Sequence, residues 1–149
     1  MANRDEGEDH SMSAFISYAA ADRAWARQFC RHLEALGVDA WLDTDELFPG
    51  DNWHRAIGNA LERSDALLVL VSPISVHSES VQREIEFALG SEKFEHRIIP
   101  IILEPTDEMP WILGKFQTVS GNPAQAAAKV AEILSATSRK AATARAHAG

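Results

Sequence analysis

The sequence predicts a single α/β domain in which helices cover both faces of a parallel β-sheet. Residues 66–71 (ALLVLV) form a six-residue run without a polar side chain, which is typical of a central strand buried on both faces. Strand-like and helix-like segments alternate along the chain. A chain of 149 residues can bury roughly 70% of its unfolded surface, which is enough for one core but not for two.

The order of the predicted elements is β-α-β-α-β-α-β-loop-β-α. Short apolar runs predict the strands, and apolar residues at helical spacing predict the helices. The expected ranges are a strand over 14–18, a helix from Asp22 to Gly37, a strand over 38–43, a helix from 51 or 52 to about 64, a strand over 66–71, a helix from about 78 to 90, a strand over 97–103, a short edge strand over 115–119 and a helix from Asn122 to about Leu134.

Residues with strong local preferences set the expected ends of the helices. Asp22 and Asn122 can act as caps, and Pro123 fits the first turn of the last helix. Gly37 and Gly90 are expected to end the two helices that precede them. In the fourth strand, Pro100 has no amide donor, which predicts a weak or peripheral hydrogen-bonding position.

Right-handed crossovers between these elements favour a flavodoxin-like three-layer sandwich with five parallel strands in the order 2-1-3-4-5. Ligands of such folds bind beyond the carboxyl ends of the strands, where the strand order reverses between the first and third strands. The side chains expected around this crevice are Ser17, Tyr18, Ala19, Ser72 and Pro73, with Asp43 and Glu84 beside them.

Glu84 stands out in the helix that follows the central strand. The apolar residues Val81, Ile85, Ala88 and Leu89 define a stripe that faces the sheet. Glu84 projects onto the flank of this stripe, whereas Glu79 and Glu86 project toward water. A half-buried carboxylate loses hydration and attracts a cationic species more strongly. The pattern alone leaves open a structural role, in which Glu84 pairs with Arg83 or Arg97.

Composition narrows the classes of function. The net charge of −8, with both signs scattered, argues against a nucleic-acid groove. The single cysteine, Cys30, cannot form an internal disulfide and is expected to be a small buried side chain. No run is long enough to span a membrane, and the acidic first residues lack the apolar core of a secretion signal, so a cytoplasmic protein is expected. The six histidines show no metal-ligand spacing.

Four segments in order resemble the conserved boxes of Toll/interleukin-1 receptor (TIR) domains. They are SAFISYAAAD, GVDAWLDTDELFPGDNW, ALLVLVSP followed by SVQREIEFAL, and RIIPIIL. The resemblance runs from Ser13 to Leu134, which implies a TIR domain over 13–134. Residues 1–12 are then expected to be a disordered acidic terminus, and residues 135–149 a flexible Ala-rich tail or linker.

The resemblance is closest to the bacterial, NAD-cleaving type of TIR domain. In that type the catalytic glutamate lies in a segment similar to SxxxxxSxWCxxEL, and SPISVHSESVQREI places Glu84 at its position. The resemblance implies that Glu84 stabilises positive charge at the anomeric carbon of the ribose as nicotinamide leaves. NAD⁺ would be the substrate and not a bound cofactor, since the chain has no GxGxxG or GxxxxGK motif.

The same resemblance implies a set of binding residues. Phe15, Ser17, Tyr18 and Ala19 would line the cleft, and Asp43 would lie at its rim. Ser72, which follows the central strand, and Ser80 are further expected substrate-binding residues. Leu47, Phe48, Pro49, Gly50 and Asp51 match the BB loop, which implies self-association through TIR–TIR contacts. The sequence departs from the motif at Ser80-Val81, where Trp-Cys is expected, and so lacks an aromatic wall for the substrate.

Other functions remain open at this stage. A non-catalytic TIR adaptor would use the Leu47–Asp51 loop for protein contacts. A phosphoacceptor receiver domain needs an aspartate where this chain has Ser72. A nucleoside deoxyribosyltransferase-like enzyme also uses a carboxylate in a related fold. For the enzyme, the resemblance implies antiphage defence by NAD⁺ hydrolysis or by formation of a cyclic ADP-ribose, with a possible sensor domain or partner protein.

Overall fold

The computed structural model describes residues 12–42, 62–90 and 97–148, with side chains described up to residue 136. Its sheet contains β1 (Ser13–Ser17), β2 (Asp39–Leu42), β3 (Ala66–Val71), β4 (Ile98–Ile102) and β5 (Val119–Ser120). The five strands lie in the order β2-β1-β3-β4-β5, and each neighbouring pair is parallel. The predicted strand order is confirmed.

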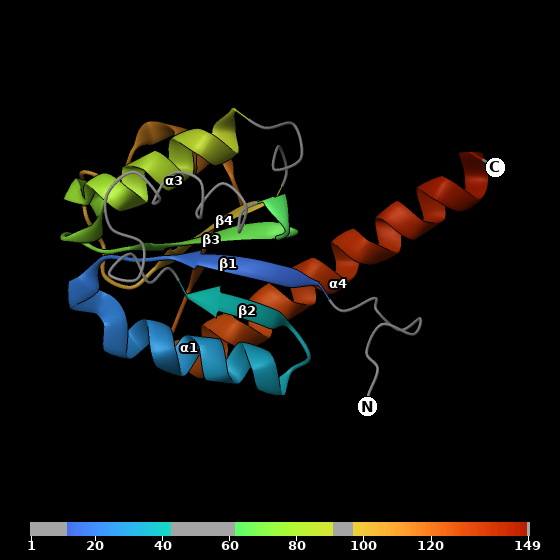
Figure 1. Cartoon of the computed structure of the whole chain (residues 1–149), viewed down its shortest axis with the longest axis horizontal. Coiled ribbons are helices and arrows are strands. Elements are labelled where there is room, and N and C mark those ends of the chain that lie inside the picture. Colours follow the sequence, from blue (N-terminus) through green and yellow to red (C-terminus); the bar gives the residue numbers. More distant parts are fainter. Residues whose placement is uncertain (1–11, 43–61, 91–96, 149) are drawn as a thin grey trace.

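Helices cover both faces of this sheet (Figure 1). Helices α1 (Arg23–Ala35) and α4 (Pro123–Ala148) lie on one face, and α3 (Glu79–Leu89) lies on the other with the short 3₁₀ helix η5 (Trp111–Lys115). The three-layer sandwich predicted from the sequence is therefore present. It places the ends of β1 and β3 side by side at the carboxyl edge of the sheet.

Two apolar clusters form the core of the described residues, one on each face of the sheet. Alternate residues of β1 contribute to different clusters, because successive side chains of a strand point to opposite faces. We call them the α1 cluster and the α3 cluster. The α1 cluster includes Ala14, Ile16, Tyr18, Phe29, Leu33, Leu68 and Val130, and the α3 cluster includes Phe15, Leu67, Val69, Val81, Ile85 and Leu113.

Most of the predicted helix ends are observed. Ser78 Oγ accepts a hydrogen bond from Val81 N at 3.4 Å and caps α3, which ends at Gly90. Gly37 follows α1 with a φ of +89°, a conformation that favours glycine. At the start of α4, Asn122 Oδ1 accepts from Gln125 N at 2.8 Å, and Gln125 Oε1 accepts from Asn122 N at 3.0 Å. This reciprocal pair is a capping box.

Three local predictions are wrong. Asp22 makes no side-chain cap to α1, and a 3₁₀ turn over Ala20–Asp22 comes before the helix. The expected edge strand over 115–119 is displaced to Val119–Ser120, because residues 111–115 form η5. Helix α4 does not end near Leu134 but continues to Ala148. Residues 135–148 are rich in Ala, Arg and Lys, which favour helix, and contain neither Gly nor Pro to end it.

Pro100 lies in β4, the second strand from the edge, and its orientation explains why it is tolerated there. Leu67 N donates to Arg97 O, and Leu103 N donates to Val71 O, both at 2.9 Å. The odd-numbered residues of this segment therefore bond to β3, and even-numbered residues such as Pro100 face the β5 side. Pairing with β5 begins only at Ile101, so the missing amide of Pro100 removes no bond from the ladder between β4 and β5.

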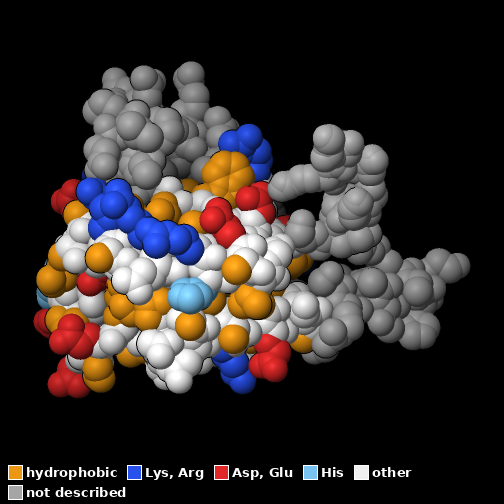
Figure 2. Space-filling model, turned by 90° about the horizontal axis from the view of Figure 1, so that it is seen from below, with side chains coloured by type: hydrophobic (Ala, Val, Ile, Leu, Met, Phe, Trp, Pro, Cys, Tyr) orange, Lys and Arg blue, Asp and Glu red, His pale blue; other side chains and the backbone are white. Residues whose placement is uncertain are grey.

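The surface on the α1 and α4 side carries basic, acidic and apolar side chains side by side (Figure 2). This mixture agrees with the scattered charges of the sequence. Among the described residues, no helix is both long and apolar enough to cross a membrane. Several predictions concern residues outside the described ranges: the helix expected over about 51–64, Asp43, the Leu47–Asp51 loop and most of the acidic terminus at 1–12.

Candidate functional site

The candidate site lies where β1 and β3 end next to each other. Ser17, the last residue of β1, is in register with Val69 of β3, and β3 continues to Val71. The loops after these strands run to opposite faces of the sheet, toward α1 and toward η3 (Ser75–His77) and α3. This is the topological switch point of the sheet, where α/β folds bind ligands.

Glu84 is bonded to the end of β1. Ser17 Oγ donates a hydrogen bond of 2.5 Å to Glu84 Oε1, although 67 residues separate the two in the chain. Both residues are 0% exposed. A buried carboxylate is costly unless it is hydrogen-bonded, so the Ser17 hydroxyl is part of what allows Glu84 to lie there.

The burial of Glu84 is deeper than the sequence predicted. The buried residues of α3 are Val81, Glu84, Ile85 and Ala88, so the carboxylate lies within the apolar stripe and not on its flank. Leu89, which was assigned to the stripe, is 41% exposed. The predicted position of the stripe rested on its apolar residues alone. The helix is turned slightly from that position, and this turn brings Glu84 onto Ser17.

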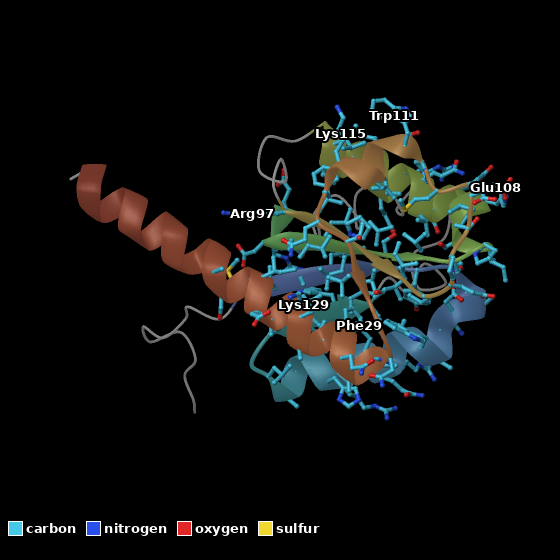
Figure 3. All side chains as sticks on the ribbon, turned by 180° about the vertical axis from the view of Figure 1, so that it is seen from behind. Phe29, Arg97, Glu108, Trp111, Lys115 and Lys129 are labelled. Atoms are coloured by element: carbon cyan, nitrogen blue, oxygen red, sulfur yellow. The ribbon has the colours of Figure 1, made fainter. Side chains whose placement is uncertain are left out.

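The two arginines that were alternatives for pairing with Glu84 have other positions. Arg83 Nη2 lies 3.6 Å from Glu79 Oε1 on the exposed side of α3. Arg97 directly precedes β4, at the amino-terminal edge of the sheet, and Figure 3 shows it at the end opposite Glu108. The predicted solvent-facing positions of Glu79 and Glu86 are confirmed, because both are exposed.

A second carboxylate reaches the switch point from the other side. Asp22 Oδ2 accepts a hydrogen bond of 2.7 Å from Ser72 Oγ, across 50 residues of sequence. Ser72 directly follows β3 and is 3% exposed. Its Oγ also accepts from Ser75 N at 3.0 Å, and Ser75 Oγ accepts from Ser72 N at 2.9 Å, which holds the loop in a tight turn.

Together the two bonds form a reciprocal connection. Ser17 at the end of β1 donates to Glu84 beyond β3, and Ser72 at the end of β3 donates to Asp22 beyond β1. Each serine therefore ties its own strand to the βα unit of the other. Sequence reasoning missed Asp22, because an aspartate at a helix start is first assigned as a cap. Its position shortly after the carboxyl end of β1 was the signal in the sequence that could have assigned it to the candidate site.

The remaining predicted binding residues are divided between different surroundings. Phe15 is 2% exposed and belongs to the α3 cluster. Tyr18 belongs to the α1 cluster, on the face away from Glu84, so the structure does not bring these two aromatic rings together. Ala19 is buried, and its carbonyl accepts from Asp22 N at 2.8 Å. Ser80 is partly exposed, with its Oγ 3.3 Å from Ser78 Oγ in the first turn of α3.

Cys30 has the structural role predicted from the sequence. It is 9% exposed within the α1 cluster. Burial, with the nearby charges of Glu34 and Asp39, raises the pKa of its thiol to about 11. A thiol in this state is neutral at physiological pH and is a poor nucleophile.

Comparison with known proteins identifies the family. The sequence pattern of the TIR domain matches residues 14–134. Toll-like receptor 6 of Dasypus novemcinctus is 34% identical over 96 residues, covering 62% of this chain and 12% of the receptor. The uncharacterised protein y4cD of Sinorhizobium fredii is 36% identical over 76 residues, covering 48% of this chain. The chain spans only about 12% of the length of these curated relatives.

Solved structures show the same fold. The TIR domain of the Toll-related receptor TRR-2 from Hydra magnipapillata superimposes with a TM-score of 0.60 at 24% identity, covering 74% of this chain and 84% of that domain. The TIR domains of the activated Roq1 resistosome give 0.52 at 22% identity, over 63% of this chain and 58% of theirs. A diflavin flavoprotein from Nostoc gives 0.52 at 14% identity, over 80% and 94%, in agreement with the flavodoxin-like topology. From its sequence match and its strand order, the chain belongs to the TIR domain family.

Proposed function

We propose that this TIR domain cleaves the bond between nicotinamide and ribose in NAD⁺, with Glu84 as the catalytic residue. The observation that carries the proposal is the bond from Ser17 Oγ to Glu84 Oε1 at the switch point of the sheet. It fixes one carboxylate, on the residue that matches the catalytic position of NAD-cleaving TIR domains, at the place where α/β folds bind nucleotides. The acidic composition and single cysteine agree with a cytoplasmic reaction.

The proposed chemistry needs little from the protein beyond this carboxylate. As the bond from C1′ to the nicotinamide nitrogen breaks, its electron pair leaves with nicotinamide, and positive charge develops on the ribose. A carboxylate held close to C1′ stabilises that charge. Nicotinamide leaves as a neutral molecule and needs no general acid. Water then adds to C1′ to give ADP-ribose and a proton, or another atom of the same molecule adds to give a cyclic product.

Glu84 must be uncovered before it can act, because it is 0% exposed in the arrangement described here. We propose that self-association of TIR domains opens the site, as expected for enzymes whose active form is an assembly. Turnover would then rise more steeply than protein concentration. Association would also be the step at which defence by NAD⁺ depletion, or by a cyclic signal, is triggered.

One observation favours a second candidate function. A fully buried Glu84, bonded to Ser17, is also what a purely structural carboxylate would look like. The curated relatives include a Toll-like receptor, and the chain matches only a small part of it. In this alternative the domain is an interaction module that binds other TIR domains and leaves NAD⁺ intact.

The deciding experiment compares wild type, Glu84→Gln and Glu86→Gln for NAD⁺ consumption, with products identified by chromatography and mass spectrometry. Glu84→Gln keeps the side-chain length and leaves an oxygen that can accept from Ser17. Glu86→Gln removes the same charge from the exposed side of the same helix. We expect turnover in wild type and Glu86→Gln, and a loss of about a hundred- to a thousandfold in Glu84→Gln, as is typical when a key electrostatic group is removed.

Thermal unfolding of the three proteins is the control for folding, and light scattering reports assembly. Nicotinamide release that requires both assembly and Glu84 supports the enzyme. Assembled wild-type protein that leaves NAD⁺ unchanged supports the interaction module. The product formed together with nicotinamide distinguishes the two enzymes: ADP-ribose indicates a hydrolase, and a cyclic product indicates a cyclase.

A further inference from the structure

The carboxylate of Asp22 lies at the switch point of the sheet, although its position in the sequence predicts a helix cap. Its residue precedes α1, but no side-chain bond to the helix forms. Instead Oδ2 turns toward β3 and accepts from Ser72 Oγ at 2.7 Å. An aspartate at a helix start usually caps the helix. Asp22 is held instead by its hydrogen bond with the hydroxyl group of Ser72 at the switch point.

The chemistry of this contact is that of sugar recognition. A carboxylate that accepts from a serine hydroxyl can accept equally well from a ribose hydroxyl. In dinucleotide-binding α/β folds, an acidic residue at the carboxyl edge of the sheet binds the 2′-hydroxyl of the adenosine ribose. Asp22 is partly exposed, so a ligand can reach it, whereas Ser72 is 3% exposed and is positioned beneath it.

The positions of the two serine contacts along the strand direction suit a dinucleotide. Glu84 is bonded at the level of Ser17, and Asp22 at the level of Ser72. Ser17 is in register with Val69, so Ser72 lies three residues farther along the strand direction. At about 3.3 Å per residue, the two levels are roughly 10 Å apart. The two riboses of NAD⁺ are joined by a pyrophosphate and lie at a comparable separation when the molecule is extended.

We propose that Asp22 binds the adenosine ribose of the substrate through its 2′-hydroxyl and thereby selects NAD⁺ over NADP⁺. This inference rests on the proposed function, because it assigns the second ribose of the same substrate. The 2′-phosphate of NADP⁺ would place negative charge against the carboxylate, in addition to removing the hydroxyl donor. Repulsion at this site therefore disfavours NADP⁺.

The residue after Asp22 favours the other dinucleotide, NADP⁺. Arg23 directly follows Asp22, and an arginine near the ribose accommodates a 2′-phosphate in folds that use NADP⁺. Asp22 thus predicts NAD⁺ as the preferred substrate, whereas Arg23 predicts NADP⁺. The position of Asp22 against Ser72 is the reason to assign the ribose to the carboxylate.

The test compares kcat/KM for NAD⁺ and for NADP⁺ in wild type, Asp22→Asn and Asp39→Asn. Asp22→Asn keeps the size of the side chain and leaves an oxygen that can accept from Ser72, while the charge is lost. Asp39→Asn makes the same charge change at an exposed position at the start of β2. We expect wild type and Asp39→Asn to prefer NAD⁺ by at least about tenfold, and Asp22→Asn to lose most of that preference.

A binding measurement keeps this test separate from the proposed activity. Calorimetry on Glu84→Gln and on Glu84→Gln/Asp22→Asn gives the dissociation constants of intact NAD⁺ and NADP⁺. A preference for NAD⁺ that disappears with Asp22→Asn supports the assignment even where wild type shows no turnover. An unchanged preference, a wild-type preference for NADP⁺, or the absence of binding of either dinucleotide at millimolar concentration would overturn it, even for an enzyme that cleaves NAD⁺.

Discussion

The two faces of the sheet are built from the same strands and yet differ in what they bury. On the α1 side, β1 contributes Ala14 and Ile16 to a cluster made of apolar side chains. On the α3 side, the same strand contributes Phe15 and then Ser17, whose hydroxyl is bonded to a buried glutamate. An apolar side chain of similar volume at position 84 would fill the space at lower cost in desolvation. The α1 face thus gains stability from apolar packing, and the buried carboxylate of the α3 face is the group to which our proposal gives a catalytic role.

Truncation in the α1 cluster should have the largest effect on stability. Phe29 is 0% exposed and packs against Trp25, with ring centroids 5.2 Å apart, and Figure 3 shows it between α1 and α4. We expect Phe29→Ala to lower the free energy of unfolding by about 3–5 kcal/mol. Trp111→Ala is the control, because Trp111 is 75% exposed and should change stability by at most about 0.5 kcal/mol. Denaturant unfolding of both variants measures the difference, and similar losses would contradict the assignment of the core.

Substitutions in the Ser17–Glu84 pair on the α3 face should change stability in a different way. Ser17→Ala alone removes the hydroxyl from a buried carboxylate and should cost about 1–3 kcal/mol. The double variant Ser17→Ala/Glu84→Met replaces both partners by apolar groups and should recover to within about 1 kcal/mol of wild type, or exceed it. If the double variant is instead less stable than Ser17→Ala, Glu84 contributes net stability and the contrast between the faces fails.

The smallest effect concerns Cys30, a buried ionisable group of the α1 cluster. Its pKa is raised from 9.0 to about 11, so the folded protein holds its proton in a range where the unfolded chain loses it. The unfolded state therefore binds fewer protons between pH 9 and 11, and the stability contributed by this group falls as the pH rises through that window. We expect the difference in stability between wild type and Cys30→Ala to shift in favour of Cys30→Ala over this range. Alkylation of the native thiol should also stay slow at about pH 9.

Sequence reasoning could predict the parts that follow from periodicity. The saturated run at 66–71 and the alternation of elements led to the strand order, and a carboxylate beside an apolar stripe singled out Glu84. The contacts that depend on tertiary structure were not predictable in this way. The turn of α3 that buries Glu84 depends on Ser17, and the orientation of Asp22 depends on Ser72, each at least 50 residues away in the chain.

Residues that are neighbours in the chain were also assigned to one cleft, although the structure places them on different faces of the sheet. Tyr18 was assigned to the same cleft as Phe15 and Ser17, but it packs in the α1 cluster. The end of α4 was misplaced because the absence of an apolar face was taken as a sign of irregular chain. Helix propensity alone is sufficient to continue the helix from Leu134 to Ala148.

The proline in β4 has a consequence for how copies of this domain can meet. Pro100 presents no amide on the side of β5, and β5 itself pairs over only two residues, Val119 and Ser120. A long exposed strand would invite a further strand from another molecule and lead to open-ended aggregation. Within the part of the chain that the structure describes, this edge of the sheet offers only a short ladder of donors and acceptors. The edge formed by β4 and β5 is therefore protected against strand exchange, which leaves side-chain surfaces as the route by which copies of the domain can associate there.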